Sequence, residues 1–262
     1  MTALLHEERR GGALVLTLDR PPVNAFDDAL LARLDAALGR AEANEGIAVL
    51  HLRSARQVFC AGADLALIRS SIATPQGLDR MLATVQGMQR VFARLEQLPC
   101  VTLAELGGAA LGGGFELALA CDWRIAAHEA RLGLPEAGLG LLAAGGGTQR
   151  LTRLLGPGPA RRLLLGAETL TGEQALALGL VQWSVPRAAL PAAAQALAER
   201  AAALPRAALA ENKRCIALAA AAQGDGYAAE IAATRRLYEN PETRRRVSAF
   251  LDARAASIQE QA

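Results

Sequence analysis

Apolar runs of strand length alternate with stretches of helical periodicity along the first half of the chain, and this alternation limits the fold more than any other feature. Short β-type runs are predicted at residues 13–19, 47–52, 101–106 and 123–127. Apolar residues recur at helical spacing over residues 29–43, 78–98 and 115–121. Strands that alternate with helices in this way predict an α/β core.

The pattern changes to helices after about Gly145, with one short strand expected at residues 181–185. Prolines stand near the expected helix starts, at Pro157, Pro159, Pro186, Pro191, Pro205 and Pro241. Residues 188–262 are Ala-rich and amphipathic, which predicts packing against the core or a sister subunit. We therefore expect a core of residues 1–187 and a helical C-terminal region of residues 188–262.

Composition excludes several classes of protein. Of the 262 residues, 52% are hydrophobic and 21% charged, so the chain has ample material for a core and is not disordered. The formal net charge is only +2, with basic residues scattered along the chain, and this balance does not predict a nucleic-acid partner. Apolar runs end well before the roughly 18 residues that a spanning helix requires, so no membrane segment is expected.

The cysteines and the N-terminal residues indicate a cytoplasmic location. Four cysteines show neither CxxC nor zinc-ligand spacing, which is typical of reduced thiols and predicts no metal site. The first residues, MTALLHEERRGG, lack the apolar stretch of a signal peptide.

Standard catalytic motifs are absent from the sequence. There is no GxGxxG, Walker, GxSxG or HExxH pattern, and the histidines are isolated from one another. His51 lies in an apolar strand, which favours a packed, hydrogen-bonded side chain over a catalytic base.

Glycine-rich backbone stands directly ahead of two expected helices, in FCAGADL (residues 59–65) and LGGGFEL (residues 111–117). The first N–H groups of a helix have no intrahelical partner and carry the positive end of its dipole, so each place can hold an anion. Taken singly, such glycines are better explained by tight packing or a helix cap. Taken together, two such donors aimed at one point would hold a developing oxyanion.

Two glutamates lie near these glycines. Glu116 falls in the first helical turn after the second glycine run, and Glu136 follows Pro135 in the loop-like segment LGLPEAGLG. One glutamate near a helix N-terminus is ordinarily a cap that satisfies the dipole. The two acids count as a pair only if the fold brings both to one cleft.

Six segments of this chain, in this order, resemble the crotonase superfamily of enoyl-CoA hydratases and isomerases. They are DRPPVNAF, FCAGADL, AALGGGFELALACD, LPEAGLG, GGGTQRL and LTGEQALALGLV. The resemblance implies an α/β fold built as a crotonase-like spiral of ββα units, with a helical C-terminal region that forms trimers, often paired into hexamers. It also implies an acyl-CoA thioester as the ligand, with coenzyme A entering as part of the substrate and no separate cofactor.

The resemblance assigns roles to particular residues. The oxyanion-hole amides correspond to Ala63 and Gly113, and the two glutamates that flank the added water correspond to Glu116 and Glu136. The implied reaction is syn addition of water to a 2-enoyl-CoA, with Glu116 helping to deprotonate the water and Glu136 supplying the proton to C2. Further substrate contacts are expected at Ala61, Gly62, Asp64, Gly112, Phe250 and Arg254. The last two resemble residues of a helix that touches the adenine end of CoA, often on the neighbouring subunit.

Some positions depart from the family pattern. Ala143 and Ala144 stand where many hydratases have a Pro-Gly pair, in a segment that lines the family's acyl pocket, so the acyl-chain preference is open. Pro22 stands where the family often offers a lysine to the CoA phosphates, and we expect arginines to substitute. Glu105 is a third acid near the expected site, and a solvated or salt-bridged side chain is the better interpretation.

Three other functions compete with the hydratase. A Δ3-Δ2 enoyl-CoA isomerase is the nearest, since one base and the same oxyanion hole suffice for a proton shift. A non-catalytic acyl-CoA binding protein has no need to retain two desolvated acids, so Glu116 and Glu136 argue against it. RNA binding occurs in one branch of the family, but a single lysine and a near-neutral charge do not favour it.

Overall fold

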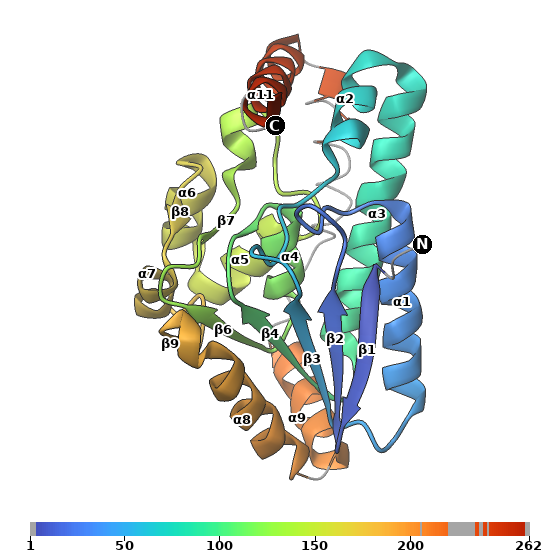
Figure 1. The fold of residues 1–262 in the computed structure, drawn as a ribbon, viewed down its shortest axis with the longest axis vertical. Helices are drawn as coiled ribbons and strands as arrows, with labels where there is room; N and C mark the ends of the chain where they lie inside the picture. Colours follow the sequence, from blue (N-terminus) through green and yellow to red (C-terminus); the bar gives the residue numbers. More distant parts are fainter. Residues whose placement is uncertain (1–3, 205, 220–233, 236–237, 240, 260–262) are drawn as a thin grey trace.

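The main layer of the protein is a six-stranded sheet, seen in a computed structural model that describes residues 4–204, 206–219, 234–235, 238–239 and 241–259 (Figure 1). The strand order is β1-β2-β3-β4-β6-β9. The strands are β1 (Leu5–Arg10), β2 (Ala13–Leu18), β3 (Val49–Ser54), β4 (Val101–Leu106), β6 (Trp123–Ala127) and β9 (Trp183–Val185). Only the β1–β2 pair is antiparallel, and each later strand joins its neighbour in parallel. The predicted α/β core is confirmed.

A second, three-stranded sheet brings two later segments together. Its order is β5 (Ala110–Leu111), β7 (Leu132–Gly133) and β8 (Thr169–Leu170), with β5 and β7 parallel. The N–H of Gly112 extends this pairing, because it donates to the carbonyl oxygen of Gly133 at 3.0 Å. The second glycine run therefore lies beside the chain that leads into Glu136.

Helices cover both sheets (Figure 1). They are α1 (Asp28–Ala43), α2 (Leu65–Ala73), α3 (Pro75–Gln97), α4 (Gly113–Leu119), α5 (Gly147–Leu155), α6 (Pro157–Leu165), α7 (Gly172–Ala177), α8 (Leu190–Ala202), α9 (Arg206–Ala219) and α11 (Pro241–Gln259), with 3-10 turns η1 (Pro135–Leu139) and η2 (Arg187–Ala189). Helix α8 packs against the main sheet, and α11 packs against α2 and η1. The core includes Phe26 and Phe92, whose fully buried rings meet edge to face at 5.5 Å between centroids.

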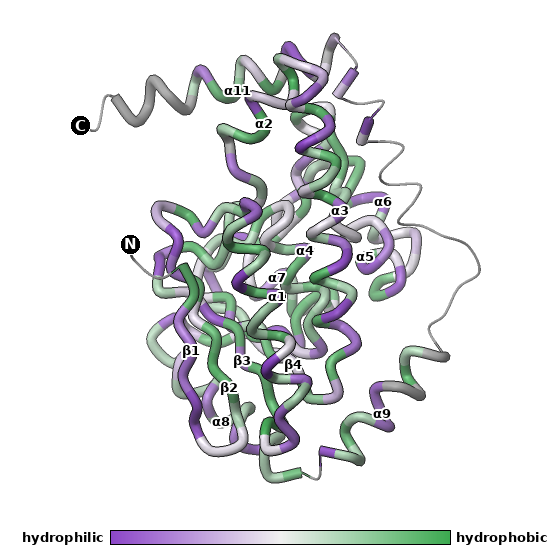
Figure 2. The backbone as a smooth tube through the Cα atoms, turned by 90° about the vertical axis from the view of Figure 1, so that its right-hand side faces the viewer, coloured by the Kyte–Doolittle hydropathy of each residue, from purple (hydrophilic) through white to green (hydrophobic). Residues whose placement is uncertain are grey.

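Strand β1 was not predicted from the sequence. Figure 2 shows it as a hydrophilic strand beside the hydrophobic β2, and every residue of β1 after Leu5 is exposed. An edge strand that buries so little side chain is held by its hydrogen bonds to the neighbouring strand, which leave no hydrophobic pattern.

Two other expectations differ from the structure, and two more are not tested by it. Helix α4 begins at Gly113, two residues earlier than predicted, and Glu136 lies in the 3-10 turn η1 instead of a loop. Pro205 lies outside the described residues. The division at residue 187 stays a prediction.

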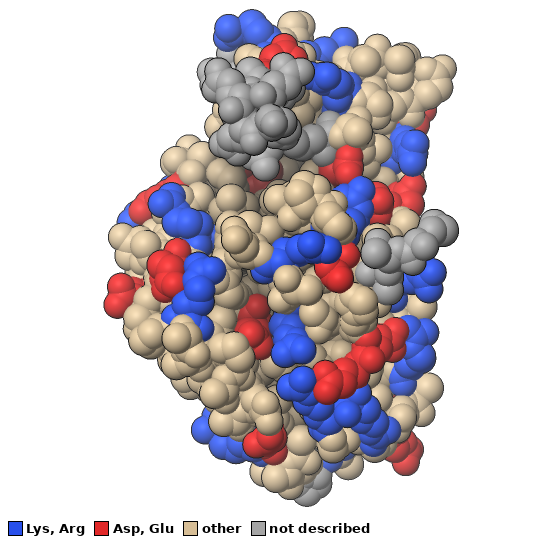
Figure 3. Space-filling model, viewed as in Figure 1, with Lys and Arg blue, Asp and Glu red and all other residues tan. Residues whose placement is uncertain are grey.

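The charge on one face follows the near-neutral composition. On the face shown in Figure 3, basic side chains alternate with acidic ones. Ion pairs of Arg10 with Glu8 at 2.8 Å and of Arg56 with Asp19 at 2.5 Å belong to the β1–β3 region. Among the described helices, none combines the length and apolarity needed to span a bilayer.

Candidate active site

A cavity of about 530 Å³ collects most of the residues that the sequence indicated. Its wall is formed by both glycine-rich loops, η1, α3 and the C-terminal segment, and it is mainly apolar. The predicted site residues that line it are Ala61, Gly62, Ala63, Gly112, Gly113, Glu116, Glu136 and Phe250. The fold therefore brings both glutamates to one cleft.

The first glycine-rich loop is held by a short parallel bridge to Phe26. The N–H of Phe26 donates to the carbonyl oxygen of Gly62 at 2.8 Å, and the N–H of Asp64 donates to the carbonyl oxygen of Phe26 at 3.0 Å. Because these two bonds flank Ala63, its own N–H faces away from Phe26. Gly62 has a φ of +94°, a left-handed conformation that favours glycine.

The second glycine-rich loop packs directly against the first. A Cβ atom at Gly62 would lie only 3.3 Å from the backbone nitrogen of Gly113. A Cβ atom at Gly114 would lie 2.1 Å from the carbonyl oxygen of Cys60, so no side chain fits there. The N–H groups of Ala63 and Gly113 are thus close to one another, and neither has a hydrogen-bond acceptor within the described part of the chain.

Glu116 lies in the first turn of α4 and is 2% exposed. Its Oε1 accepts a hydrogen bond of 2.7 Å from the N–H of Gly147, the first residue of α5. A Cβ atom at Gly145 would lie 2.8 Å from Oε2, so the GGG run of residues 145–147 closes on this carboxylate from two sides. A backbone N–H at a helix start stabilises a negative charge placed against it. The sequence pattern alone did not indicate this role of the GGG run.

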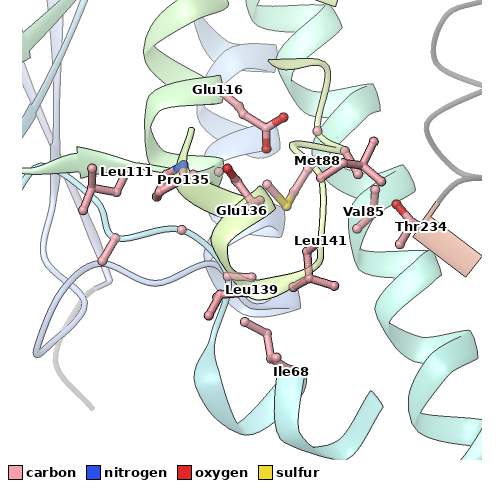
Figure 4. A pocket seen from close by; sticks show the side chains of 18 of the residues that line it. Ile68, Val85, Met88, Leu111, Glu116, Pro135, Glu136, Leu139, Leu141 and Thr234 are labelled. Atoms are coloured by element: carbon pink, nitrogen blue, oxygen red, sulfur yellow. The ribbon is translucent and has the colours of Figure 1, made fainter. Parts of the chain in front are cut away.

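Glu136 lies in the first turn of η1, on another wall of the cavity. The residue as a whole is half-buried, but its Oε2 atom is buried and makes no hydrogen bond to the described residues. A Cβ atom at Gly112 would lie 2.7 Å from Oε1. Burial raises the pKa of Glu136 to about 7, against a smaller lowering by its own backbone N–H. Figure 4 shows both carboxyl groups near the side chain of Met88.

Asp64 is not among the residues that line the cavity, although a substrate contact was expected there. Its carboxylate caps α2 and accepts a hydrogen bond of 2.7 Å from Arg20, which also binds Asp27 at 3.0 Å. Partial burial raises the pKa of Asp64, but the hydrogen bonds from Arg20 and from the helix N–H groups together outweigh this effect. The net pKa of Asp64 therefore lies below its usual range. Asp64 and Arg20 therefore anchor the loop that carries Ala63, a role of Arg20 that the sequence pattern did not indicate.

Four other residues complete the comparison with the sequence. Phe250 reaches the cavity from α11, whereas the side chain of Arg254 lies outside the described residues. Glu105 does not line the cavity, and its Oε2 lies 2.8 Å from Nε2 of the buried His51. The packed position of His51 is confirmed, and the solvated or salt-bridged state of Glu105 stays a prediction.

The topology is that of the crotonase fold. A solved structure titled as an enoyl-CoA hydratase from Bacillus halodurans superposes with a TM-score of 0.87. That similarity covers 94% of this chain and all of the other, at 26% sequence identity.

The chain belongs to the enoyl-CoA hydratase/isomerase family, whose model matches residues 8–261. A protein of Bacillus subtilis named probable enoyl-CoA hydratase is 40% identical over 167 residues, which are 64% of this chain and 63% of the relative. A short-chain-enoyl-CoA hydratase of Clostridium acetobutylicum is 36% identical over 201 residues, or 74% and 73% of the two chains. The chain thus spans a little under two thirds of the first of these relatives and nearly three quarters of the second.

Proposed function

We propose that this protein is an enoyl-CoA hydratase that adds water across the double bond of a 2-enoyl-CoA thioester. The observation that carries the proposal is the meeting of two carboxyl groups, Glu116 and Glu136, with two backbone N–H groups that have no acceptor among the described residues, around one cavity. The family membership and the names of the relatives support the same reaction.

The N–H groups of Ala63 and Gly113 are suited to hold the thioester carbonyl oxygen. Attack of water at C3 moves the π electrons of the C2–C3 bond through the carbonyl, so negative charge develops on that oxygen. Fixed donors stabilise this charge more in the transition state than in the ground state, by roughly 3–4 kcal/mol for one donor of this type. The apolar cavity wall strengthens the effect, because it excludes water.

The two acids divide the proton transfers. Glu116, held by the N–H of Gly147, accepts a proton from the water as its oxygen bonds to C3. Glu136, whose pKa is raised to about 7 by burial, is about half protonated at neutral pH, and its protonated form gives its proton to C2 of the enolate. The cycle closes when Glu116 releases its proton and Glu136 is reprotonated. Carboxyl groups that share one site titrate as a pair, so the two assignments are tested together.

The resemblance also suggests where the rest of the substrate and other subunits bind. We propose that Phe250 and Arg254 of α11 contact the CoA portion, with arginines on its phosphates, and that the chain assembles as trimers or paired trimers. Multi-angle light scattering measures the assembly state directly. Substitution of Phe250 by Ala is expected to raise KM for the CoA ester and leave kcat nearly unchanged.

Spectrophotometry tests the proposed reaction. Addition of the protein to crotonyl-CoA is expected to remove the absorbance of the conjugated thioester, and Glu116→Gln and Glu136→Gln should each abolish most of that change. A protein that leaves crotonyl-CoA intact but converts a 3-enoyl-CoA into a conjugated product is an isomerase instead. A protein that binds CoA esters and changes neither is a binding protein.

A further inference from the structure

The cavity extends well beyond the two acids, along one face of α3. Met88 lies beside Glu116 and Gly113, and Val85 and Met81 line the cavity successively farther along the helix. At 1.5 Å of rise per residue, Met81 is about 10 Å from Met88 along the helix axis. An acyl chain whose double bond lies between the acids therefore has room to run several carbons toward Met81.

The far part of this extension is apolar on most sides. Leu78, Met81, Leu82, Val85, Ala144 and Tyr238 form a buried cluster of their own, separate from the main core. Ile68, Leu141 and Leu142 pack against it. No lysine, arginine or histidine is among the described residues that line the cavity, so a carboxylate at the end of the acyl group has no cation to meet.

One polar group interrupts this apolar wall. Thr234 is 4% exposed and lines the cavity, and its Oγ1 is a buried atom without a hydrogen-bond partner among the described residues. Figure 4 shows its hydroxyl oxygen on the side of the cavity lined by Val85. A buried hydroxyl left without a partner is less stable than one that is hydrogen-bonded, because it has lost its hydrogen bonds to water. Such a group, in the wall of a ligand cavity, indicates a partner that arrives with the ligand.

Tyr238 is a second hydroxyl-bearing residue among those that line the cavity. Tyr238 is 4% exposed and hydrogen-bonds to Ser71 of α2, and burial raises its pKa to about 12, so it stays neutral. The Ser71 hydroxyl donates to the carbonyl oxygen of Ile68 at 2.6 Å, so the tyrosine proton serves the Tyr238–Ser71 bond. The lone pairs of the tyrosine oxygen are left as acceptors.

From these contacts we infer that the acyl end of the cavity is a hydrogen-bonding subsite, formed by Thr234 and Tyr238, for an acyl group that carries a neutral oxygen beyond the reacting double bond. A hydroxyl group fits best, because it can accept from Thr234 and donate to the oxygen of Tyr238. A carbonyl oxygen satisfies Thr234 alone. This inference rests on the proposed hydratase function and names its substrate class.

Matched substrates test the inference on the wild-type protein. The pairs are straight-chain 2-enoyl-CoA esters, such as 2-heptenoyl-CoA, and analogues in which a hydroxyl replaces the terminal methyl, such as 6-hydroxy-2-hexenoyl-CoA. At the chain length that reaches Thr234, kcat/KM is expected to favour the hydroxyl analogue by about tenfold, since the alkyl ester leaves the threonine unsatisfied. If the alkyl ester is preferred at every length, the inference is wrong.

Variants then assign the preference to the residue. Thr234→Val keeps the shape of the side chain and is expected to remove the preference, whereas Thr234→Ser is expected to keep it. Thr84→Val is the matched control: Thr84 is also buried, on α3, but its hydroxyl bonds to Asp28 at 3.0 Å and it is not among the residues lining the cavity. A preference that survives Thr234→Val, in protein that still hydrates crotonyl-CoA, overturns the inference alone. Failure to hydrate any 2-enoyl-CoA overturns the proposed function instead.

Discussion

The backbone N–H of Gly147 donates a hydrogen bond of 2.7 Å to Oε1 of Glu116, across a separation of 31 residues. This contact links the start of α5 to the first turn of α4, so two helix N-termini meet at one carboxylate. The positive ends of both helix dipoles favour a negative charge at that point. The GGG run of residues 145–147 therefore stabilises the negative charge of Glu116, the acid that follows the LGGG run of residues 111–114.

Loss of the Glu116 charge is expected to abolish most of the hydratase activity. Glu116→Gln keeps the size of the side chain and an oxygen that can accept from Gly147, but an amide cannot take a proton from water. We expect kcat to fall by about a hundredfold or more, the usual contribution of a general base. Steady-state kinetics with crotonyl-CoA and circular dichroism of the same sample check this. Near-normal turnover in a folded variant removes Glu116 from the mechanism.

A methyl group at Gly147 is expected to displace Glu116. A Cβ atom there would lie 2.8 Å from Oε1 of Glu116 and 2.9 Å from side-chain atoms of Ala143 and Leu134. These contacts are shorter than van der Waals distance on three sides, so Gly147→Ala should lower both kcat and the melting temperature. Gly158→Ala in α6 is the control, because nothing lies within 4 Å of its Cβ position. An equal effect of the two substitutions contradicts the packing argument.

The candidate site is predictable from the sequence where the backbone conformation requires a particular residue type. Gly62 and Gly112 have a positive φ and Gly114 lies against the backbone of Cys60, and such requirements appear as glycine at fixed positions. The glycine pattern alone accordingly points to both loops. The sequence also indicates Glu116 and Glu136 as candidates, but their meeting depends on the β5–β7 pairing, which two-residue strands do not reveal.

Other parts of the site are not indicated by any local sequence pattern. Arg20 is one arginine among many, and only the folded chain shows that it binds two helix-capping aspartates at once. Thr234 becomes unusual only because the cavity around it is apolar and its hydroxyl has no described partner. Long-range contacts of this kind depend on the tertiary fold and not on local propensity or periodicity.

The pH dependence of the reaction is expected to follow Glu136. In the proposed mechanism this residue is the acid, so the protonated form is the active one, and burial raises its pKa to about 7. kcat/KM should therefore fall as the pH rises above about 7, approaching tenfold per pH unit. Measurement of kcat/KM for crotonyl-CoA as a function of pH tests this decrease. A plateau that extends several pH units higher shows that Glu136 is not the proton donor.

Glu136 is also expected to reduce the stability of the fold at alkaline pH. Its folded pKa of about 7 lies above the ordinary value of 4.5, so the native state holds the proton more tightly than the unfolded chain. The contribution to stability is complete below about pH 4.5 and is lost as the pH rises through about 7. Glu136→Gln, which does not titrate, should gain free energy of unfolding relative to the wild type between about pH 5 and pH 8, by about 3 kcal/mol at most. Urea unfolding of the variant and the wild type at both pH values measures the difference between their free energies of unfolding. If that difference is the same at both pH values, the pKa of Glu136 is not raised.

Arg20 is expected to act on catalysis through the position of Ala63. Its guanidinium donates to Asp64 at 2.7 Å and to Asp27 at 3.0 Å, and these aspartates cap α2 and α1. Ala63 lies directly before Asp64, so a loop released from Arg20 no longer holds the Ala63 N–H toward the cavity. We expect Arg20→Ala to lose about 1–2 kcal/mol of stability, since the pairs are partly exposed.

The catalytic loss should exceed what this lower stability explains. At a temperature where Arg20→Ala is fully folded, kcat should still be reduced severalfold, because the oxyanion donor is displaced while the acids are untouched. Arg20→Lys keeps a charge but cannot bridge both aspartates with one planar fork, so its kcat should lie between the kcat of the wild type and that of Arg20→Ala. Arg162→Ala removes the exposed ion pair with Glu168 at 2.6 Å, distant in sequence from both loops, and should leave kcat unchanged. If Arg20→Ala lowers the melting temperature but has wild-type kcat when folded, its role is confined to stability.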